Sequence, residues 1–347
     1  MNPNSALPCK KLGSTSVEVP ALGCGAATLG NLYRAISDEQ AQATLAAAFS
    51  SGLTYVDTAP HYGQGLSERR VGNSLAKGIL VSTKVGRVLN PIASPPPGTE
   101  RHGFVDGDPF EPEFDYSYDG IMRSFEASQK RLNREYIDIL LVHDLGHATH
   151  NEKAPRHMSA FLSGGYKAMQ SLKDQGLTGA IGIGVNEWQV CEDLMSQVSL
   201  DVILLAGRYT LLEQTALDSF LPACEHRNIS IILGGPFNSG ILIEGITDTR
   251  VPHYNYEPAP PEIVGRVRAL QSVCEAHGVP LAAAALQFPL AHPAVASVIP
   301  GMASADQVRA NRRLLDTFIP SALWSDLRTE GLLHPLAPVS MAERVAS

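Results

Sequence analysis

The sequence lacks the segments that mark a secreted or membrane-spanning protein. No stretch of its 347 residues approaches the roughly 18 consecutive apolar residues that a membrane helix needs. The first residues, MNPNSALPCKKLG, contain no hydrophobic core of a signal peptide. The five cysteines show neither disulfide nor metal-site spacing, which predicts isolated, mostly buried thiols. We therefore expect a cytoplasmic protein.

The chain also contains fewer basic than acidic residues. Lysine and arginine number 27 against 35 aspartates and glutamates, a formal net charge of −8. This balance argues against nucleic acid and against an anionic membrane surface as partners. Hydrophobic residues make up 44% of the chain, which is enough for a large core. The sequence makes no prediction of oligomeric state.

Short apolar segments alternate with helical patterns along the chain. Segments typical of buried strands are 20–25, 53–57, 79–84, 136–143, 180–184, 202–206, 229–233 and 295–299. Helical patterns cover 38–52, 66–78, 118–132, 163–176, 188–198, 213–228, 261–278 and 305–315. Ser37 should cap the first helix and Gly52 should end it. Repeated strand–helix units with apolar strands predict a parallel sheet covered by helices. Eight such units favour a single (β/α)8 barrel domain, an α/β fold, over residues 1–347.

Two long segments interrupt this alternation. Residues 86–117 follow the third strand, are rich in proline and glycine, and show no helical period; residues 235–260 follow the seventh strand. Long irregular loops in compact domains commonly carry function. Since both segments leave the C-terminal ends of strands, we expect them to overhang the site as specificity loops or lids. The tail 317–347 should form one or two short helices around Pro335 and Pro338 that pack on the barrel.

Four ionisable residues lie at or just beyond the ends of predicted strands. Asp57 ends LTYVD, Lys84 ends ILVSTK, and His143 ends IDILLVH, while Tyr62 lies in the loop after Asp57. Parallel α/β barrels build their active sites at this end of the strands. Tyr62 is the expected general acid–base, because the ammonium of Lys84 should lower its high pKa. Asp57 would hold Lys84, and His143 would hydrogen-bond the reacting oxygen. Each residue alone also fits a structural role, but together they indicate a hydride-transfer site.

The segments that contain these residues, VDTAPHYGQGLSE, VSTKVGR and IDILLVHD, resemble the signature segments of the aldo-keto reductases. Members of that family are (β/α)8 barrels that transfer a hydride to or from a nicotinamide cofactor. The resemblance begins at KLGSTSVEVPALGCGAATLG, which would form a hairpin plugging the barrel bottom and the first strand, and ends near residue 316. It implies catalytic roles for Asp57, Tyr62, Lys84 and His143.

The resemblance also implies a site for NAD or NADP. GIGVNEW resembles a strand-five segment that usually reads Gly-Val-Ser-Asn, but here Gly184 replaces the serine and Asn186 is displaced by one position. LGGPFNSGIL resembles the segment whose backbone meets the pyrophosphate, and IPGMASADQVRAN the segment that binds the adenosine half. The implied cofactor-binding residues are Asn186, Gly235, Pro236, Phe237, Gly240, Gly301, Ser304, Gln307 and Asn311.

The residue at position 303 favours NAD. Relatives that prefer NADP often carry an arginine where this chain has Ala303. An uncharged alanine near the acidic Asp306 offers no partner for a 2′-phosphate. Arg309, Arg312 and Arg313 lie on the same predicted helix, and they keep NADP open.

Three features resemble one branch of the family: GAATLGNLY, FDYSYDGIMRSFEASQKRL and the pair His143–Asp144. That branch comprises the D-threo-aldose 1-dehydrogenases, also called L-fucose or L-galactose dehydrogenases, and pyridoxal 4-dehydrogenase. It implies a small-molecule substrate that closes as a cyclic hemiacetal, such as L-fucose, L-galactose or D-arabinose, and its oxidation to a lactone. Oxidation of pyridoxal is one alternative, and NADPH-dependent reduction of simple aldehydes or ketones is another. Discrimination would fall to the loops 86–117, 144–162 and 241–260.

Other classes of function also stay open. Some relatives of this barrel bind the cofactor but serve as regulatory subunits of ion channels. His143, His147 and His150 have a helical spacing that would suit a metal-dependent hydrolase, although the glycine-containing continuation favours a loop. GCGAATLG begins with G-x-G but has no third glycine at the spacing of a Rossmann fingerprint, so we expect a tight strand exit there.

Overall fold

Eight parallel strands form the centre of the computed structural model, which describes residues 7–247, 251–255 and 257–339. Their order is β16-β13-β12-β11-β10-β5-β4-β3. The strands are β3 (Cys24–Gly25), β4 (Tyr55–Asp57), β5 (Leu80–Val85), β10 (Ile137–His143), β11 (Thr178–Val185), β12 (Val202–Ala206), β13 (Ser230–Gly234) and β16 (Val295–Ile299). Parallel bridges from Leu22 to Val298 and from Gly25 to Gly301 bring the first and last strands together. The predicted barrel is confirmed, and every predicted strand overlaps an observed one.

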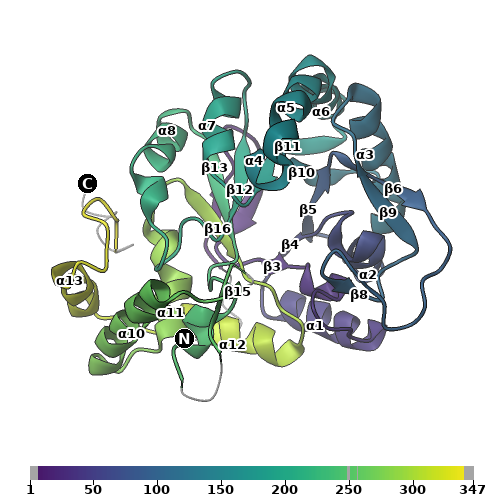
Figure 1. Ribbon diagram of the computed structural model, residues 1–347. Helices are drawn as coiled ribbons and strands as arrows, with labels where there is room; N and C mark the ends of the chain where they lie inside the picture. The colour runs from purple at the N-terminus through teal and green to yellow at the C-terminus, as the bar shows by residue number, and fades with distance from the viewer. Residues whose placement is uncertain (1–6, 248–250, 256, 340–347) are drawn as a thin grey trace.

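Helices surround these strands (Figure 1). They are α1 (Asp38–Ser50), α2 (Leu66–Gly72), α3 (Tyr118–Leu132), α4 (His147–His150), α5 (Ala154–Ala160), α6 (Tyr166–Asp174), α7 (Gln189–Met195), α8 (Phe220–His226), α9 (Ile241–Glu244), α10 (Pro261–Ala276), α11 (Leu281–Gln287), α12 (Ala305–Asp316) and α13 (Ser321–Thr329). Ser37 caps α1 as predicted, because its Oγ accepts a hydrogen bond from the backbone N–H of Gln40 at 3.2 Å. Such a cap satisfies a helix donor that has no partner within the helix.

Several helices differ from the sequence-based expectation. The predicted helix 66–78 ends at Gly72, and only Phe220–His226 of the predicted 213–228 is α-helical. The patterns also missed α4, α5, α9 and α11. In α11 every residue from Leu281 to Leu286 is buried, so the helix lacks the polar face on which an amphipathic pattern depends.

A short hairpin plugs the N-terminal end of the barrel, as the family resemblance implied. It consists of β1 (Cys9–Lys11) and β2 (Glu18–Pro20), which pair antiparallel. Leu12, Val17 and Val19 pack with inward-facing strand residues in one buried cluster. A hydrogen bond ties the hairpin to the start of β13: the Oγ of Ser230 accepts a hydrogen bond from the N–H of Gly13 at 2.9 Å. A second, larger cluster fills the layer between the strands and the helices.

The segment 86–117 is not an irregular loop, contrary to the prediction. Its outer part is a hairpin of β6 (Arg87–Pro91) and β9 (Phe110–Phe114), beside α3 (Figure 1). Nested within it is a smaller hairpin of β7 (Glu100–Arg101) and β8 (Phe104–Val105). Both outer strands contain a proline, which lacks the N–H that pairing between strands uses. Because of this composition, the sequence pattern indicated a loop.

The second insertion is also partly ordered. It contains α9 and a hairpin of β14 (His253–Tyr254) and β15 (Glu257–Pro258). Positions 248–250 and 256 of this predicted specificity loop lie outside the described residues.

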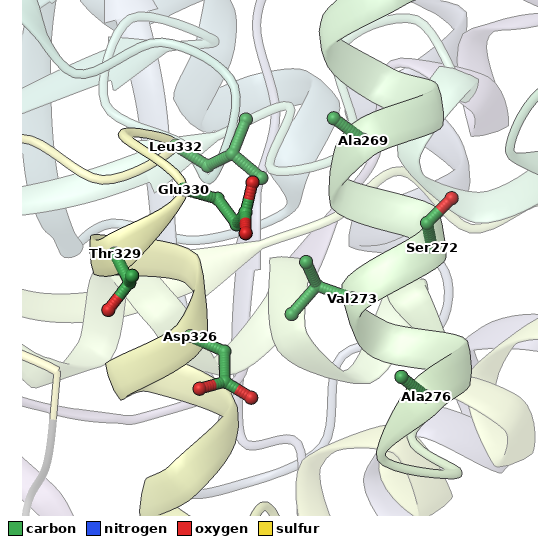
Figure 2. A pocket seen from close by; sticks show the side chains of 8 residues that line it. All are labelled: Ala269, Ser272, Val273, Ala276, Asp326, Thr329, Glu330 and Leu332. Atoms are coloured by element: carbon green, nitrogen blue, oxygen red, sulfur yellow. The ribbon is translucent and has the colours of Figure 1, made fainter.

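The tail packs on the barrel as predicted, through α13. Leu323, Trp324 and Leu327 of this helix are buried. The helix precedes Pro335 and Pro338 rather than forming around them, and 340–347 lie outside the described residues. A groove separates α13 from α10 (Figure 2). Its lining residues are Ala269, Ser272, Val273, Ala276, Asp326, Thr329, Glu330 and Leu332.

All five cysteines have free thiols, as predicted; Cys9 is exposed and the other four are buried. Within the part of the chain that the structure describes, no helix combines the length and apolarity that crossing a membrane requires.

Truncating Leu12 to alanine tests the barrel plug. Leu12 has no exposed surface, so Leu12→Ala should lower the free energy of unfolding by about 2–5 kcal/mol, measured by urea denaturation. Glu18→Ala, at an exposed position of the same hairpin, should change it by no more than about 0.5 kcal/mol. Equal effects of the two variants would contradict the plugging role of the hairpin.

Candidate active site

The structure brings Asp57, Tyr62, Lys84 and His143 together at the C-terminal ends of β4, β5 and β10. The Nζ of Lys84 lies 2.8 Å and 3.0 Å from the two carboxylate oxygens of Asp57, and it also donates to the carbonyl of Thr58 at 2.9 Å. The same Nζ lies 4.6 Å from the ring centre of Tyr62. The rings of Tyr62 and His143 are nearly perpendicular, with centres 6.0 Å apart.

Two glycines position the loop that carries Tyr62. Gly30 ends one turn of 3-10 helix, Thr28–Gly30, and Gly63 lies in another, Tyr62–Gly65. A Cβ on Gly30 would lie 2.7 Å from the carbonyl carbon of Tyr62, and one on Gly63 would lie 2.4 Å from the carbonyl oxygen of Gly30. The two turns are packed backbone against backbone, so neither position leaves space for a side chain. This close contact fixes the position of the Tyr62 backbone.

A chain of buried hydrogen bonds supports Asp57 from inside the barrel. The Oγ of Ser82 donates to Asp57 Oδ1 at 2.6 Å, and the hydroxyls of Ser82 and Tyr55 are 2.8 Å apart. The sequence analysis did not single out Ser82 or Tyr55. Strand periodicity could have indicated both residues. Tyr55 lies two positions before Asp57 and Ser82 two positions before Lys84, so each shares a strand face with an active-site residue.

Burial dominates the ionisation of Tyr62. It raises the pKa of Tyr62 to about 12, although the charge of Lys84 acts to lower it. The predicted effect of Lys84 thus has the expected sign, but burial outweighs it. For Lys84, burial acts to lower the pKa, but the charges of Asp57 and Tyr62 prevail and raise it. At neutral pH the site therefore holds an ammonium beside a protonated phenol.

Two histidines at the site are neutral at physiological pH. Burial, together with the positive charges of Arg87 and Lys84, lowers the pKa of His143 well below 6.5. Burial and Arg87 lower the pKa of His61 to about 3. Neutral imidazoles can both donate and accept hydrogen bonds.

A cavity of about 350 Å³ opens at these strand ends. Its lining residues are Gly25, Ala27, Thr28, Leu32, Tyr33, Asp57, His61, Tyr62, Lys84, His102, Phe104, His143, Asp144, Gly184, Val185, Asn186, Leu204, Ala206, Gly234, Gly235, Ile299 and Gly301. All four predicted catalytic residues are among them. None of the residues that line the α10–α13 groove is shared.

The nested hairpin forms part of the cavity wall. His102 and Phe104 line the cavity from β7–β8, and an antiparallel bridge joins Phe104 to Leu32. The ring centre of His61 lies 5.4 Å from that of Phe104 and 5.9 Å from that of His102. The segment 86–117 therefore does overhang the site as expected. Sequence analysis missed these wall residues, because pairing within a hairpin cannot be inferred from a proline-rich composition.

Three of the predicted cofactor residues line the same cavity, namely Asn186, Gly235 and Gly301. Gly235 has a φ of 56°, a conformation that favours glycine. Beyond the cavity, Gly240 has a φ of 93° and no heavy atom within 4 Å of an added Cβ. This open backbone in the loop between β13 and α9 fits the close approach of phosphate oxygens.

The predicted residues Pro236, Phe237, Gly240, Ser304, Gln307 and Asn311 do not line the cavity. At the start of α12, the Oγ of Ser304 accepts from the N–H of Gln307 at 3.3 Å. The side-chain oxygen of Gln307 accepts from the N–H of Ala303 at 2.7 Å. Asn311 is buried. An adenosine group would therefore meet a helix start that is already capped by its own side chains.

The histidines that suggested a metal are dispersed. His147 is exposed, and the Nε2 of the buried His150 lies 2.8 Å from the hydroxyl of Tyr116. In the described ranges, no three His, Cys, Asp or Glu side chains are grouped so that they could hold a metal ion.

With this geometry established, comparison with known proteins identifies the class. Residues 21–328 match the aldo/keto reductase family, and the chain belongs to it. The chain is 42% identical over 335 residues to pyridoxal 4-dehydrogenase of Microbacterium luteolum, which covers 93% of this chain and 97% of that one. It is 38% identical over 327 residues to D-threo-aldose 1-dehydrogenase of a Pseudomonas species, with 92% and 96% covered.

A solved structure shows the same fold. The holo form of an aldo-keto reductase from Bacillus halodurans matches with a TM-score of 0.73 at 24% identity, over 96% of this chain and 98% of that one. The protein is therefore an oxidoreductase of a family that binds NAD or NADP and acts on small molecules.

Replacing Lys84 by methionine should destabilise the barrel, because it leaves the buried carboxylate of Asp57 without its cation. We expect the free energy of unfolding at pH 7 to fall by about 3–5 kcal/mol. Lys173→Met, which breaks a more exposed pair with Asp201, should cost no more than about 1 kcal/mol. Urea denaturation of both variants measures the difference.

The pH dependence of this effect has a defined sign. The pKa of Lys84 is raised above its ordinary value of 10.5 in the folded protein. Its contribution is therefore complete below that value and is lost only as the pH rises through the folded-state pKa. The difference between wild type and Lys84→Met should not shrink between about pH 6 and 9; a difference that shrinks across this range would contradict the assignment.

Proposed function

We propose that this protein is an NAD-dependent dehydrogenase that oxidises the anomeric carbon of a cyclic hemiacetal to a lactone. The proposed substrate is an aldose such as L-fucose, L-galactose or D-arabinose. The observation that carries the proposal is the buried ion pair of Lys84 and Asp57 directly beside Tyr62. A fixed ammonium next to a phenol supports proton exchange between Tyr62 and a substrate oxygen.

In this proposal the Tyr62 hydroxyl first loses its own proton to water, and the resulting phenolate accepts the proton of the anomeric hydroxyl. The hydrogen on the anomeric carbon leaves as a hydride, with both electrons of the C–H bond. The electrons of the former O–H bond then form the carbon–oxygen double bond of the lactone. Bound nicotinamide supplies the hydride acceptor. Lys84 stabilises the phenolate of Tyr62, and Asp57 keeps Lys84 in place. His143, being neutral, hydrogen-bonds the reacting oxygen. The products are the lactone, the reduced cofactor and one proton.

The cavity wall and the relatives support a cyclic substrate. Phe104 and Tyr33 contribute aromatic surface to the wall, and His61 and His102 contribute polar groups. A mixture of aromatic and polar groups fits a ring that carries hydroxyls. Pyridoxal is the second candidate, favoured by the 42% identity to a pyridoxal 4-dehydrogenase. Both compounds can close as cyclic hemiacetals, so the same residues serve either.

For the cofactor we propose three contact regions. Asn186, Gly235 and Gly301 would lie at the nicotinamide end, because they share the cavity with Tyr62. Pro236, Phe237 and Gly240 would meet the pyrophosphate, and Ser304, Gln307 and Asn311 the adenosine half.

The surroundings of Ala303 support a preference for NAD. Its N–H is bonded to Gln307 and its carbonyl to the side chain of Gln40. Arg309 is paired with Asp306 at 2.6 Å, and Arg312 is buried. We expect a lower KM for NAD⁺ than for NADP⁺ in initial-rate measurements with one fixed substrate. A lower KM for NADP⁺ would contradict the preference.

Activity and the role of Tyr62 can be tested together. Formation of NADH, followed by absorbance, should occur with at least one of L-fucose, L-galactose, D-arabinose and pyridoxal. Tyr62→Phe should reduce kcat by about 10²-fold or more, since it removes the proton acceptor. Tyr166→Phe loses a surface hydrogen bond to Ser199 and should retain wild-type rates.

Two outcomes would overturn the proposal. Turnover confined to simple aldehydes with NADPH would make the protein a generic reductase. Tight NAD⁺ binding without turnover of any compound would favour a role as a cofactor-binding regulatory subunit.

A further inference from the structure

Asp144 places a buried carboxylate in the wall of the cavity. It directly follows His143 at the end of β10, lines the cavity and is 8% exposed. Its backbone has a φ of 51°, and its N–H donates to the carbonyl of Gly184 at 2.9 Å. The side chain is therefore fixed beside the reacting centre without belonging to the predicted catalytic set.

Arg87 anchors this carboxylate. The Nη2 of Arg87 donates to Asp144 Oδ2, and its guanidinium lies over the ring of Phe114, 4.6 Å from the ring centre. The hydroxyl of Tyr116 donates to the carbonyls of His143 and Asp144, at 2.8 Å and 3.1 Å. All three supporting side chains come from the segment 86–117, so the insertion holds Asp144 in position.

One oxygen of the carboxylate remains available. The Oδ2 of Asp144 accepts the hydrogen bond from Arg87 and lies 3.4 Å from the Nε2 of His143. Among the described residues, no donor hydrogen-bonds to Oδ1. Because Asp144 lines the cavity, a ligand held there can bring a hydrogen-bond donor to this oxygen.

Two ring nitrogens in the same wall also lack a hydrogen-bond partner within the described ranges. The Nδ1 atoms of His61 and His143 are buried and, among the described groups, have no hydrogen-bond partner. Their rings lie 6.2 Å apart, centre to centre. The wall thus combines polar side chains that have unused hydrogen-bonding capacity with the aromatic ring of Phe104, a combination that suits a hydroxylated ring.

The charge of the pair defines the ligand further. Arg87 balances the charge of Asp144, so the pair attracts neither a cation nor an anion strongly. A carboxylate only accepts hydrogen bonds. A neutral hydroxyl donor is therefore the group that fits.

We propose that Asp144, anchored by Arg87, is a specificity-determining residue that accepts a hydrogen bond from a non-reacting hydroxyl of the cyclic substrate. It selects hydroxylated rings over aldehydes without hydroxyls. The inference rests on the proposed function, because it concerns the substrate of the same site.

The test compares Asp144→Asn with a matched control. Asp108→Asn also removes a carboxylate paired with an arginine, in this case Arg69 of α2. Asp108 lies in the insertion 86–117 and does not line the cavity. Kinetics are measured for L-fucose and pyridoxal with NAD⁺ and for butanal with NADH. Calorimetry measures the Kd of methyl α-L-fucopyranoside, which keeps the non-reacting hydroxyls but cannot be oxidised, for the protein–NADH complex.

In Asp144→Asn, we expect the KM of the hemiacetal substrate and the Kd of the glycoside to rise about 10- to 100-fold, as for the loss of a hydrogen bond to a charged group. The kcat/KM for butanal should stay within about threefold of wild type. Asp144→Ser should give the same pattern, and Asp108→Asn should match wild type. Thermal unfolding of each variant verifies that it is folded.

The remaining outcomes separate the two proposals. An unchanged Kd, or an equal loss of kcat with hydroxylated and simple substrates, would overturn the role of Asp144 alone. Wild-type protein that binds the glycoside but oxidises neither hemiacetal would overturn the proposed function alone. Wild-type protein that neither binds the glycoside nor oxidises a hemiacetal would overturn both.

Discussion

The buried ion pair of Lys84 and Asp57 is the constraint on which the rest of the site depends. Burying two charges is costly unless their geometry is good and their remaining hydrogen-bonding capacity is used. Here the Ser82 hydroxyl and the Thr58 carbonyl meet that requirement. Inside the closed barrel both side chains of the pair are almost fully removed from water. In turn its ammonium acts on the neighbours, favouring the phenolate of Tyr62 and disfavouring protonation of His143.

The insertion 86–117, which follows β5, completes the cavity that opens at the strand ends of the barrel. The strand ends supply the charged pair, whereas the hairpins supply the wall and, through Arg87 and Tyr116, the hold on Asp144. The two parts meet at His143 and Asp144, which are adjacent in sequence and whose carbonyls both accept a hydrogen bond from the Tyr116 hydroxyl. Such a division lets the wall differ between relatives while the charged pair stays the same.

Sequence patterns predicted the barrel and the gathering of the four ionisable residues, because strand periodicity and strand ends are local features. They did not predict the wall, since the pairing of Arg87 with Phe114 spans the proline-rich stretch and leaves no periodic trace. Nor did they predict that burial would outweigh Lys84 in setting the pKa of Tyr62, because that balance depends on the packed surroundings. Ser82 escaped notice because its hydroxyl matters only once β4 and β5 are side by side.

The buried cysteines have a consequence for the chemical durability of the protein. Burial raises the pKa of Cys24 and of Cys224 to about 12 and that of Cys274 to about 11. Because the thiolate is the nucleophile, these thiols have almost no reactive form at neutral pH. A protein of a family that works on carbonyl compounds is thereby protected from addition of its own sulfur atoms to the electrophiles it encounters. Among the described cysteines, Cys9 alone is left within reach of such reagents.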